Sequence, residues 1–214
     1  MRNQIVKPNR DIGDAIERAL DALNDAQLVV YPTETFYGLG ADATSARALE
    51  RLFAIKRREA DKPVGLIVAD LAMARQVVAE IPPDALRLAE AFWPGPLTMV
   101  LPALAGLDSA LLNANGGVGL RVSPNPIAFE LVRRLGRPLT ATSANLAGEP
   151  PADTIEKARA AFGNKVAIYI EGGQLGMTQA STVIDFEHNQ PRVLRVGPIS
   201  KTQIAAALNR EVLS

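Results

Sequence analysis

The residues of this chain that could do chemistry occupy four separated segments, each next to the predicted end of a strand or helix. All four contain hydroxyl, amide or cationic side chains, and one of them, 116–121, also contains glycine. The carboxyl ends of parallel strands meet at one edge of a sheet, so we expect the segments to come together. We predict that they form one anion-binding cavity. The segments are residues 32–37, 56–62, 116–121 and 142–145.

Three cations, Lys56, Arg58 and Lys62, lie within seven positions at the end of a predicted helix. Guanidinium groups bind phosphate oxygens through paired hydrogen bonds, and lysine supplies a mobile point charge. Together the three side chains suit a triphosphate. The same cations could instead complement the dipole at the helix C-terminus, so this segment taken alone leaves both interpretations open.

Three glycines, Gly116, Gly117 and Gly119, lie shortly before Arg121 in a predicted strand. They match neither the Walker loop nor the dinucleotide fingerprint, because no helix is predicted to follow them. Glycine does let a ligand approach the backbone closely. Arg121 is a cation in an otherwise apolar strand, so its side chain either faces solvent or has a carboxylate partner.

Covalent catalysis is not expected. The chain has no cysteine, and its one histidine, His188, falls in a predicted hairpin turn. Without a base, Ser143 lacks activation as a nucleophile. We interpret Ser143 and Asn145 as hydrogen-bonding groups for a ligand or, alternatively, as an ordinary turn and helix cap. What remains is catalysis by positioning and charge stabilisation of a bound nucleotide, with no protein metal site and with Mg²⁺ held mainly by the nucleotide's phosphates.

Length and composition indicate one large globular domain. The 214 residues are 48% hydrophobic and 21% charged, which is near the average for globular proteins. Lys plus Arg and Asp plus Glu both number 23, so the chain as a whole does not attract nucleic acid. The polar N-terminus and the lack of an apolar run of roughly 18 residues predict a cytoplasmic protein with no membrane association.

Hydrophobic periodicity predicts an α/β domain with a twisted, open, mixed sheet and flanking helices. Gly38 and Gly40 are expected to continue the loop that starts at Pro32. Asp153 with Glu156, and Ser200 with Gln203, resemble helix-capping pairs. Helices are predicted at 11–25, 45–55, 71–79, 83–91, 126–135, 153–162 and after 200, and strands at 27–31, 64–68, 98–101, 118–122, 139–141, 166–170, 181–186 and 192–196.

Six motifs occur in order along the chain: Pro-Thr-Glu-Thr-Phe-Tyr-Gly-Leu-Gly at 32–40, Lys-Arg-Arg at 56–58, Trp-Pro-Gly-Pro-Leu-Thr at 93–98, Ser-Ala-Asn at 143–145, Ser-Thr-Val-Ile at 181–184 and Leu-Arg-Val-Gly-Pro at 194–198. Together they resemble the YrdC/Sua5 family over about residues 12–200. The resemblance implies a YrdC-like fold with a concave basic cavity. It also implies a single domain over 1–214, the short form that lacks the C-terminal domain of longer members.

The resemblance also implies an activity. Members of that family are threonylcarbamoyl-AMP synthases, which make L-threonylcarbamoyladenylate and pyrophosphate from L-threonine, bicarbonate or CO₂, and ATP. Downstream threonylcarbamoyl transferase proteins use the product for the t⁶A modification at position 37 of tRNA. Weak binding of tRNA to the chain itself is compatible with this activity.

The family's site residues carry over to matching positions of this sequence. Lys56 and Arg58 would be catalytic, because their charges would offset the negative charge that develops on the phosphates. Threonine would be held by Thr35, Arg121, the Ala141 backbone and Ser181. ATP would be held by Arg58, Lys62, the Gly117 backbone, Ser143, Asn145, Pro151 and Arg195.

Two positions depart from the family pattern, and two other functions remain open. Glu59 follows Arg58 where many members have proline, and residues 64–68 lack a histidine that many members carry. One alternative is an RNA-binding module without turnover, for tRNA or double-stranded RNA. The other is a paralogue that handles carbamoyl adenylate without threonine.

Overall fold

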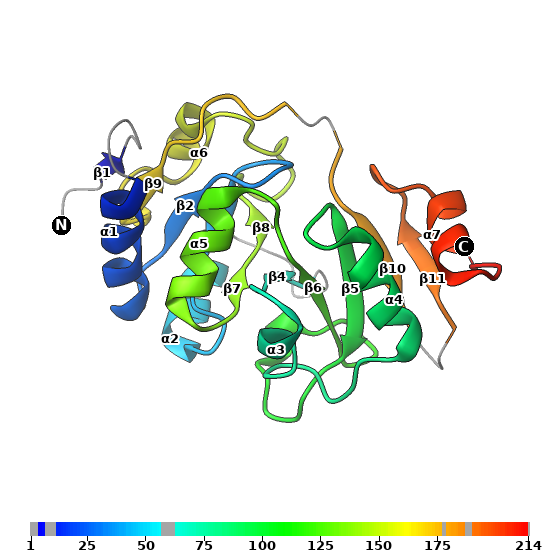
Figure 1. Ribbon diagram of the computed structural model, residues 1–214. Helices are drawn as coiled ribbons and strands as arrows, with labels where there is room; N and C mark the ends of the chain where they lie inside the picture. The colour runs from blue at the N-terminus through cyan, green and yellow to red at the C-terminus, as the bar shows by residue number, and fades with distance from the viewer. Residues whose placement is uncertain (1–3, 7–11, 57–62, 177–178, 187–189, 214) are drawn as a thin grey trace.

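A computed structural model describes residues 4–6, 12–56, 63–176, 179–186 and 190–213. The strands of these residues form two mixed sheets, which lie side by side in Figure 1. The five-stranded sheet has the order β1 (Gln4–Val6), β9 (Ile168–Ile170), β2 (Val29–Tyr31), β3 (Gly38–Gly40) and β8 (Thr142–Ser143). The six-stranded sheet has the order β11 (Arg192–Arg195), β10 (Thr182–Asp185), β5 (Leu97–Pro102), β6 (Gly117–Arg121), β4 (Leu66–Ile67) and β7 (Leu139–Thr140).

The two sheets are joined by the chain between β7 and β8. Only Ala141 separates these strands, and its N–H donates to the Gly65 carbonyl at 2.7 Å. Thr140 also links the sheets, because its hydroxyl accepts from the Ala41 N–H at 2.8 Å and donates to the Leu39 carbonyl at 3.1 Å. The strand ends of both sheets therefore meet at a fixed junction.

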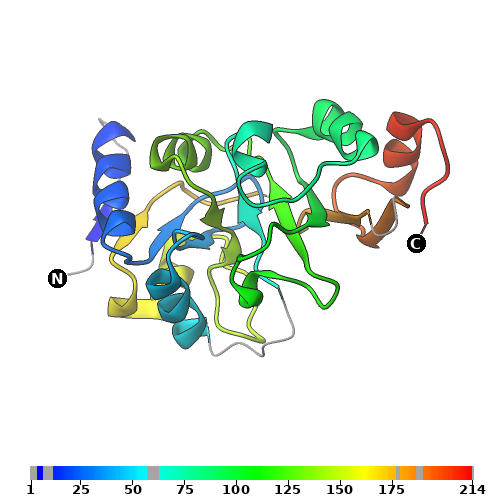
Figure 2. The ribbon, with the colours of Figure 1, turned by 90° about the horizontal axis from the view of Figure 1, so that it is seen from below.

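Helices cover the sheets with their apolar faces. α1 (Ile12–Asn24) packs against α5 (Pro126–Leu135) and against strands β2 and β9, while α4 (Pro83–Phe92) packs against α7 (Lys201–Leu208); both pairs are visible in Figure 1 and, from below, in Figure 2. The remaining helices are α2 (Ala46–Lys56), α3 (Leu71–Ala74) and α6 (Ile155–Phe162), with short 3₁₀ turns at Ser109–Leu111 and Gly163–Lys165.

The predicted fold class, an α/β domain with flanking helices and mixed β-structure, is confirmed, although the strands divide into two sheets instead of one. The helix predicted at 126–135 has its predicted bounds. The capping box of Ser200 with Gln203 is also present. These signals are local in sequence, so tertiary packing did not change them.

Three predictions about single elements are wrong. The helix predicted at 71–79 ends at Ala74, because the following backbone pairs with the chain around the end of β5, including Ala79 N–H to the Pro102 carbonyl at 2.9 Å. Residues 38–40 form β3 instead of a loop. The cap of α6 is Thr154, whose side chain accepts from the Lys157 N–H, whereas Asp153 forms an ion pair with the Lys157 ammonium at 2.7 Å.

No helix in the part of the chain that the structure describes is both long enough and apolar enough to cross a membrane.

Candidate functional site

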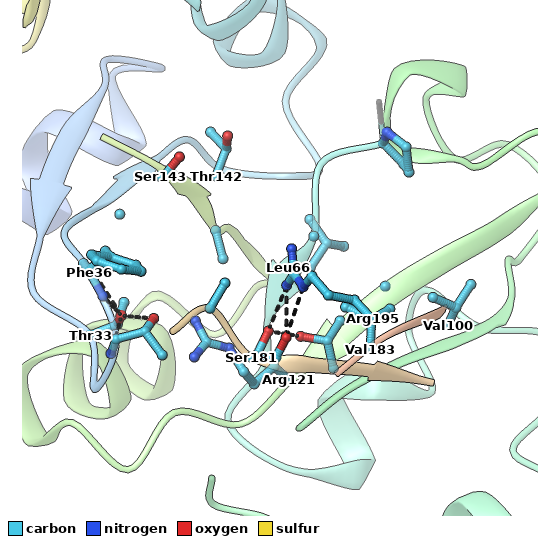
Figure 3. Close-up of a pocket in the computed structure, with 18 of the residues that line it drawn as sticks. Thr33, Phe36, Leu66, Val100, Arg121, Thr142, Ser143, Ser181, Val183 and Arg195 are labelled. Carbon is cyan, nitrogen blue, oxygen red and sulfur yellow. Dashed lines mark hydrogen bonds between the residues drawn. The ribbon is translucent and has the colours of Figure 1, made fainter. Parts of the chain in front are cut away.

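A cavity of about 450 Å³ lies where the two sheets meet. Its walls come from the loop after β2, from β3 and β8 of one sheet, and from strands β4, β5, β6, β10 and β11 of the other. Figure 3 shows Thr33 and Phe36 on one side, Thr142 and Ser143 on another, and Arg121, Ser181 and Arg195 grouped together. Residues of three of the four predicted segments, 32–37, 116–121 and 142–145, therefore line one cavity.

Eight of the twelve expected site residues, eleven for substrate binding and Lys56 for catalysis, line this one cavity. Of the remaining four, Arg58 and Lys62 lie outside the described residues. Lys56 and Asn145 are not among the described residues that line it. The eight are Thr35, Gly117, Arg121, Ala141, Ser143, Pro151, Ser181 and Arg195.

Arg121 is a buried cation at the end of β6, with 7% of its surface exposed. The sequence left open whether it faces solvent or a carboxylate, and the structure pairs it with Glu34 from the loop after β2. Burial, with a contribution from the nearby charge of Arg195, lowers the pKa of the Arg121 guanidinium to about 10, so it stays charged at neutral pH. Two cations near one cavity wall favour an anionic ligand.

Ser181 and Arg195 form one hydrogen-bonded unit at the start of the β10–β11 hairpin. The Arg195 side chain donates to the Ser181 carbonyl from Nε at 3.0 Å and from Nη2 at 2.9 Å. The Ser181 hydroxyl lies 2.8 Å from that of Thr98 on β5. Residues expected to bind threonine and ATP are therefore in direct contact with each other.

The Gly117 backbone and the Ser143 hydroxyl, which we expected to bind ATP, already have hydrogen-bond partners within the protein. The Gly117 N–H donates to the Asn113 side chain at 2.7 Å, and its carbonyl accepts from the Asn113 N–H at 2.8 Å. The Ser143 hydroxyl donates to the side-chain oxygen of Asn145. A nucleotide at this wall would therefore meet backbone and hydroxyl groups that already have partners.

Lys56 is the last residue of α2, and only 4% of its surface is exposed. Its ammonium donates to the carbonyls of Ser143 and Asn145, each at 2.8 Å. We expected Lys56 to act on the substrate directly. In the structure, the ammonium contacts the backbone at Ser143, in β8, and at Asn145, just after it.

Sequence reasoning missed some residues that shape the site. Glu34 was noted within its motif but not as the partner of Arg121, and Thr98 was noted only in the motif at 93–98. Asn113, which orders the Gly117 turn, had no motif to mark it. Their roles depend on contacts across the sheets, which no local pattern predicts.

The described residues contain no group of three or more histidine, cysteine, aspartate or glutamate side chains that could hold a metal ion. The cavity walls supply cations, hydroxyls and amides.

A sequence model of the Sua5/YciO/YrdC family, described as "Telomere recombination", matches residues 21–197. The chain belongs to the Sua5/YciO/YrdC family. It is 40% identical over 199 residues to a "putative threonylcarbamoyl-AMP synthase" of Mycobacterium tuberculosis, covering 93% of this chain and 91% of that one. It is 39% identical over 184 residues to the threonylcarbamoyl-AMP synthase of Vibrio cholerae, covering 85% and 97%.

Solved structures of the Sua5/YciO/YrdC family share the fold. Pyrococcus abyssi Sua5 complexed with L-threonine matches with a TM-score of 0.91 at 32% identity, over 100% of this chain and 63% of that one. This chain therefore spans less than two thirds of that relative's length. Escherichia coli YciO matches with a TM-score of 0.83 at 28% identity, over 94% and 99%. The family predicted from the sequence motifs is confirmed.

Proposed function

We propose that this protein synthesises L-threonylcarbamoyladenylate from L-threonine, bicarbonate or CO₂, and ATP, with release of pyrophosphate. The observation that carries the proposal is the convergence of eight expected substrate-binding residues on one cavity. It is supported by the names of the synthase relatives and by the family member solved with L-threonine.

In this proposal, threonine lies at the wall formed by Thr35, Arg121 and Ser181. The guanidinium of Arg121 suits the amino acid's carboxylate, because a planar fork of N–H donors matches two carboxylate oxygens. The Ala141 backbone and the hydroxyls of Thr35 and Ser181 supply shorter-range hydrogen bonds. These groups would hold the amine in one orientation.

The chemistry then needs neither a protein nucleophile nor a metal bound by the protein. The threonine amine attacks CO₂ and forms a carbamate, with loss of one proton. The carbamate oxygen attacks the α-phosphorus of ATP, and the bond to the bridging oxygen of pyrophosphate breaks. Arg195, with Arg58 and Lys62, would stabilise the charge on the phosphates, and Mg²⁺ would be held mainly by the nucleotide.

Lys56 acts in this scheme through the loop that follows β8. Its hydrogen bonds to the carbonyls of Ser143 and Asn145 hold that loop against α2. We therefore assign it a positioning role for the nucleotide, in place of the direct catalytic contact expected from the sequence.

The product is a mixed anhydride, and its consumer would be a transferase that passes the threonylcarbamoyl group to adenosine 37 of tRNA. Direct binding of tRNA to this chain would be weak. The chain has equal numbers of acidic and basic residues, 23 of each, so it has no overall attraction for a polyanion.

The test is pyrophosphate release by the purified protein with ATP and Mg²⁺, together with mass spectrometry of the adenylate product. We expect release only when threonine and bicarbonate are both present. Release at an unchanged rate without threonine would rule out this function and favour the carbamoyl-adenylate paralogue. Retardation of tRNA in a gel at moderate salt, with no turnover of any nucleotide, would favour the RNA-binding alternative.

A further inference from the structure

Glu34 lies between two threonines that line the cavity, yet it is not itself among the described lining residues. Its side chain is 12% exposed. One carboxylate oxygen forms an ion pair with Arg121 Nη1. The other accepts a hydrogen bond from the Ser123 hydroxyl at 2.5 Å. The carboxylate therefore contacts Arg121 from outside the cavity wall.

These contacts connect the two sheets at the site. Glu34 belongs to the loop after β2 in the five-stranded sheet, while Arg121 ends β6 in the six-stranded sheet. Ser123 is fully buried, and its hydroxyl also accepts from the Asn125 N–H at 3.2 Å, where Asn125 caps α5. The position of the Glu34 carboxylate is thus determined from both sheets.

To bind a carboxylate, Arg121 must be oriented as well as charged. A guanidinium is planar, so an ion pair at one Nη1 edge fixes the direction of its remaining N–H groups. A buried cation also needs a nearby countercharge. Arg195 does not supply one, because its positive charge repels that of Arg121. Glu34 supplies both the countercharge and the fixed direction.

We propose that Glu34 is a positioning residue for substrate recognition: held by Ser123, it orients Arg121 so that the cavity selects a ligand with a free carboxylate. This inference rests on the proposed function, because it takes L-threonine as the ligand. It predicts selectivity for the carboxylate, which a purely structural ion pair would not control.

The experiment compares L-threonine with L-threoninamide, which lacks the carboxylate charge. Calorimetric titrations of the 214-residue chain, as wild type and as Glu34→Gln, measure the affinities for threonine and for threoninamide. We expect wild type to prefer threonine clearly. The variant should lose about 10- to 100-fold in threonine affinity, because charge-assisted hydrogen bonds to Arg121 lose their alignment. Its preference for threonine over threoninamide should shrink in parallel, while its affinity for ATP, titrated in the same way, changes by less than about threefold.

Two further variants complete the design. Ser123→Ala removes the hydroxyl that donates to Glu34 and accepts from the Asn125 N–H, and it should weaken threonine binding by about three- to tenfold in the same selective way. Glu130→Gln breaks a largely exposed ion pair with Arg133 on α5 and should change neither affinity. If Glu34→Gln does not fold, Ser123→Ala carries the test.

Each outcome separates this inference from the proposed function. Unchanged threonine selectivity in Glu34→Gln or in a folded Ser123→Ala would overturn the positioning role. So would an equal loss of threonine and ATP binding together with a lower unfolding temperature, because that result indicates a structural role. A wild-type protein that binds no threonine would overturn the proposed function and this inference with it.

Discussion

Arg121 and Arg195 give the cavity its cationic wall, and each is held by groups from another strand or loop. Glu34 pairs with Arg121, and the Ser181 carbonyl accepts two hydrogen bonds from Arg195. Side chains held in this way lose little rotamer freedom when a ligand binds, which favours affinity for a small anionic substrate. Lys56 provides the same kind of support for the backbone at Ser143.

The residue-scale prediction concerns Lys56→Met. Methionine keeps much of the side-chain length but removes the ammonium that donates to the carbonyls of Ser143 and Asn145. Hydrogen bonds from a charged group contribute about 1.5–3 kcal/mol, so we expect the KM for ATP to rise about 10- to 100-fold. Threonine affinity should change by less than about threefold, because Thr35 and Arg121 lie on other elements. Steady-state kinetics with each substrate varied in turn measures both effects.

The control for that variant is Lys157→Met on α6. Its side chain is 61% exposed and forms an i,i+4 ion pair with Asp153, so its removal should leave both kinetic constants unchanged. If Lys56→Met and Lys157→Met changed the KM for ATP equally, that result would argue against a specific role for Lys56.

At the scale of elements, short strands build the site. β3, β4, β7 and β8 have only two or three residues each, and their positions depend on side chains that bridge the sheets. The ring of Tyr31 illustrates this. It packs over β3, where a Cβ at Gly40 would come within 2.8 Å of the ring, and its hydroxyl donates to the Thr140 carbonyl at 2.8 Å. Glycine at position 40 is required by this close contact.

The element-scale prediction concerns Thr140, a fully buried residue of β7 whose hydroxyl bonds to the backbone of β3 and of Ala41 just after it. Thr140→Val keeps the shape but leaves the Ala41 N–H and the Leu39 carbonyl without their hydroxyl partner. Each buried group left unsatisfied costs about 1–3 kcal/mol, so the loss of two partners should lower the free energy of unfolding by about 2–6 kcal/mol. Urea denaturation measures this change.

Thr140→Ser provides the matched comparison, because it keeps the hydroxyl and removes one methyl group. Its loss should be about 1 kcal/mol. If the two variants lost the same stability, the methyl group would matter and the hydroxyl bridge would not.

At the scale of the whole molecule, the cavity lies between two sheets that are linked through Ala141. Ligands that contact both sheets bind the folded chain and have no equivalent site in the unfolded chain. Threonine would touch the loop after β2 and the end of β6, and ATP would touch β8 and β11. Binding should therefore stabilise the protein as a unit.

The whole-molecule prediction is a thermal shift with L-threonine and a non-reactive ATP analogue whose α,β-bridging oxygen is a methylene group. Each ligand at 100 times its Kd should add about 2.7 kcal/mol, which corresponds to roughly 5–11 °C for a chain of this size. L-Valine, which has the shape of threonine without the hydroxyl, should give a smaller shift at the same concentration as threonine. A shift of equal size with valine would contradict recognition of the hydroxyl group by Thr35 and Ser181.

Much of the helical structure could be predicted because its signals are local. α5 begins after Asn125, has proline at its first position and ends at Gly136 in the left-handed region, with φ of 69°. The 71–79 segment could not be predicted in the same way, since its second half bonds to the chain around β5 instead of continuing a helix. β1 was missed because a three-residue strand is defined by its pairing with β9, not by its own pattern.

Motifs and hydrophobic periodicity were enough to predict the fold class, most helices, the family and eight of the residues that line the cavity. Three contacts became visible only in the folded chain: Glu34 pairs with Arg121, Lys56 holds the backbone 87 residues away at Ser143, and Arg195 contacts Ser181. The physical reason is that residue type and periodicity specify local backbone conformation and the buried face. Contacts between distant side chains depend on the order and register of strands, and these are set by packing of the whole chain.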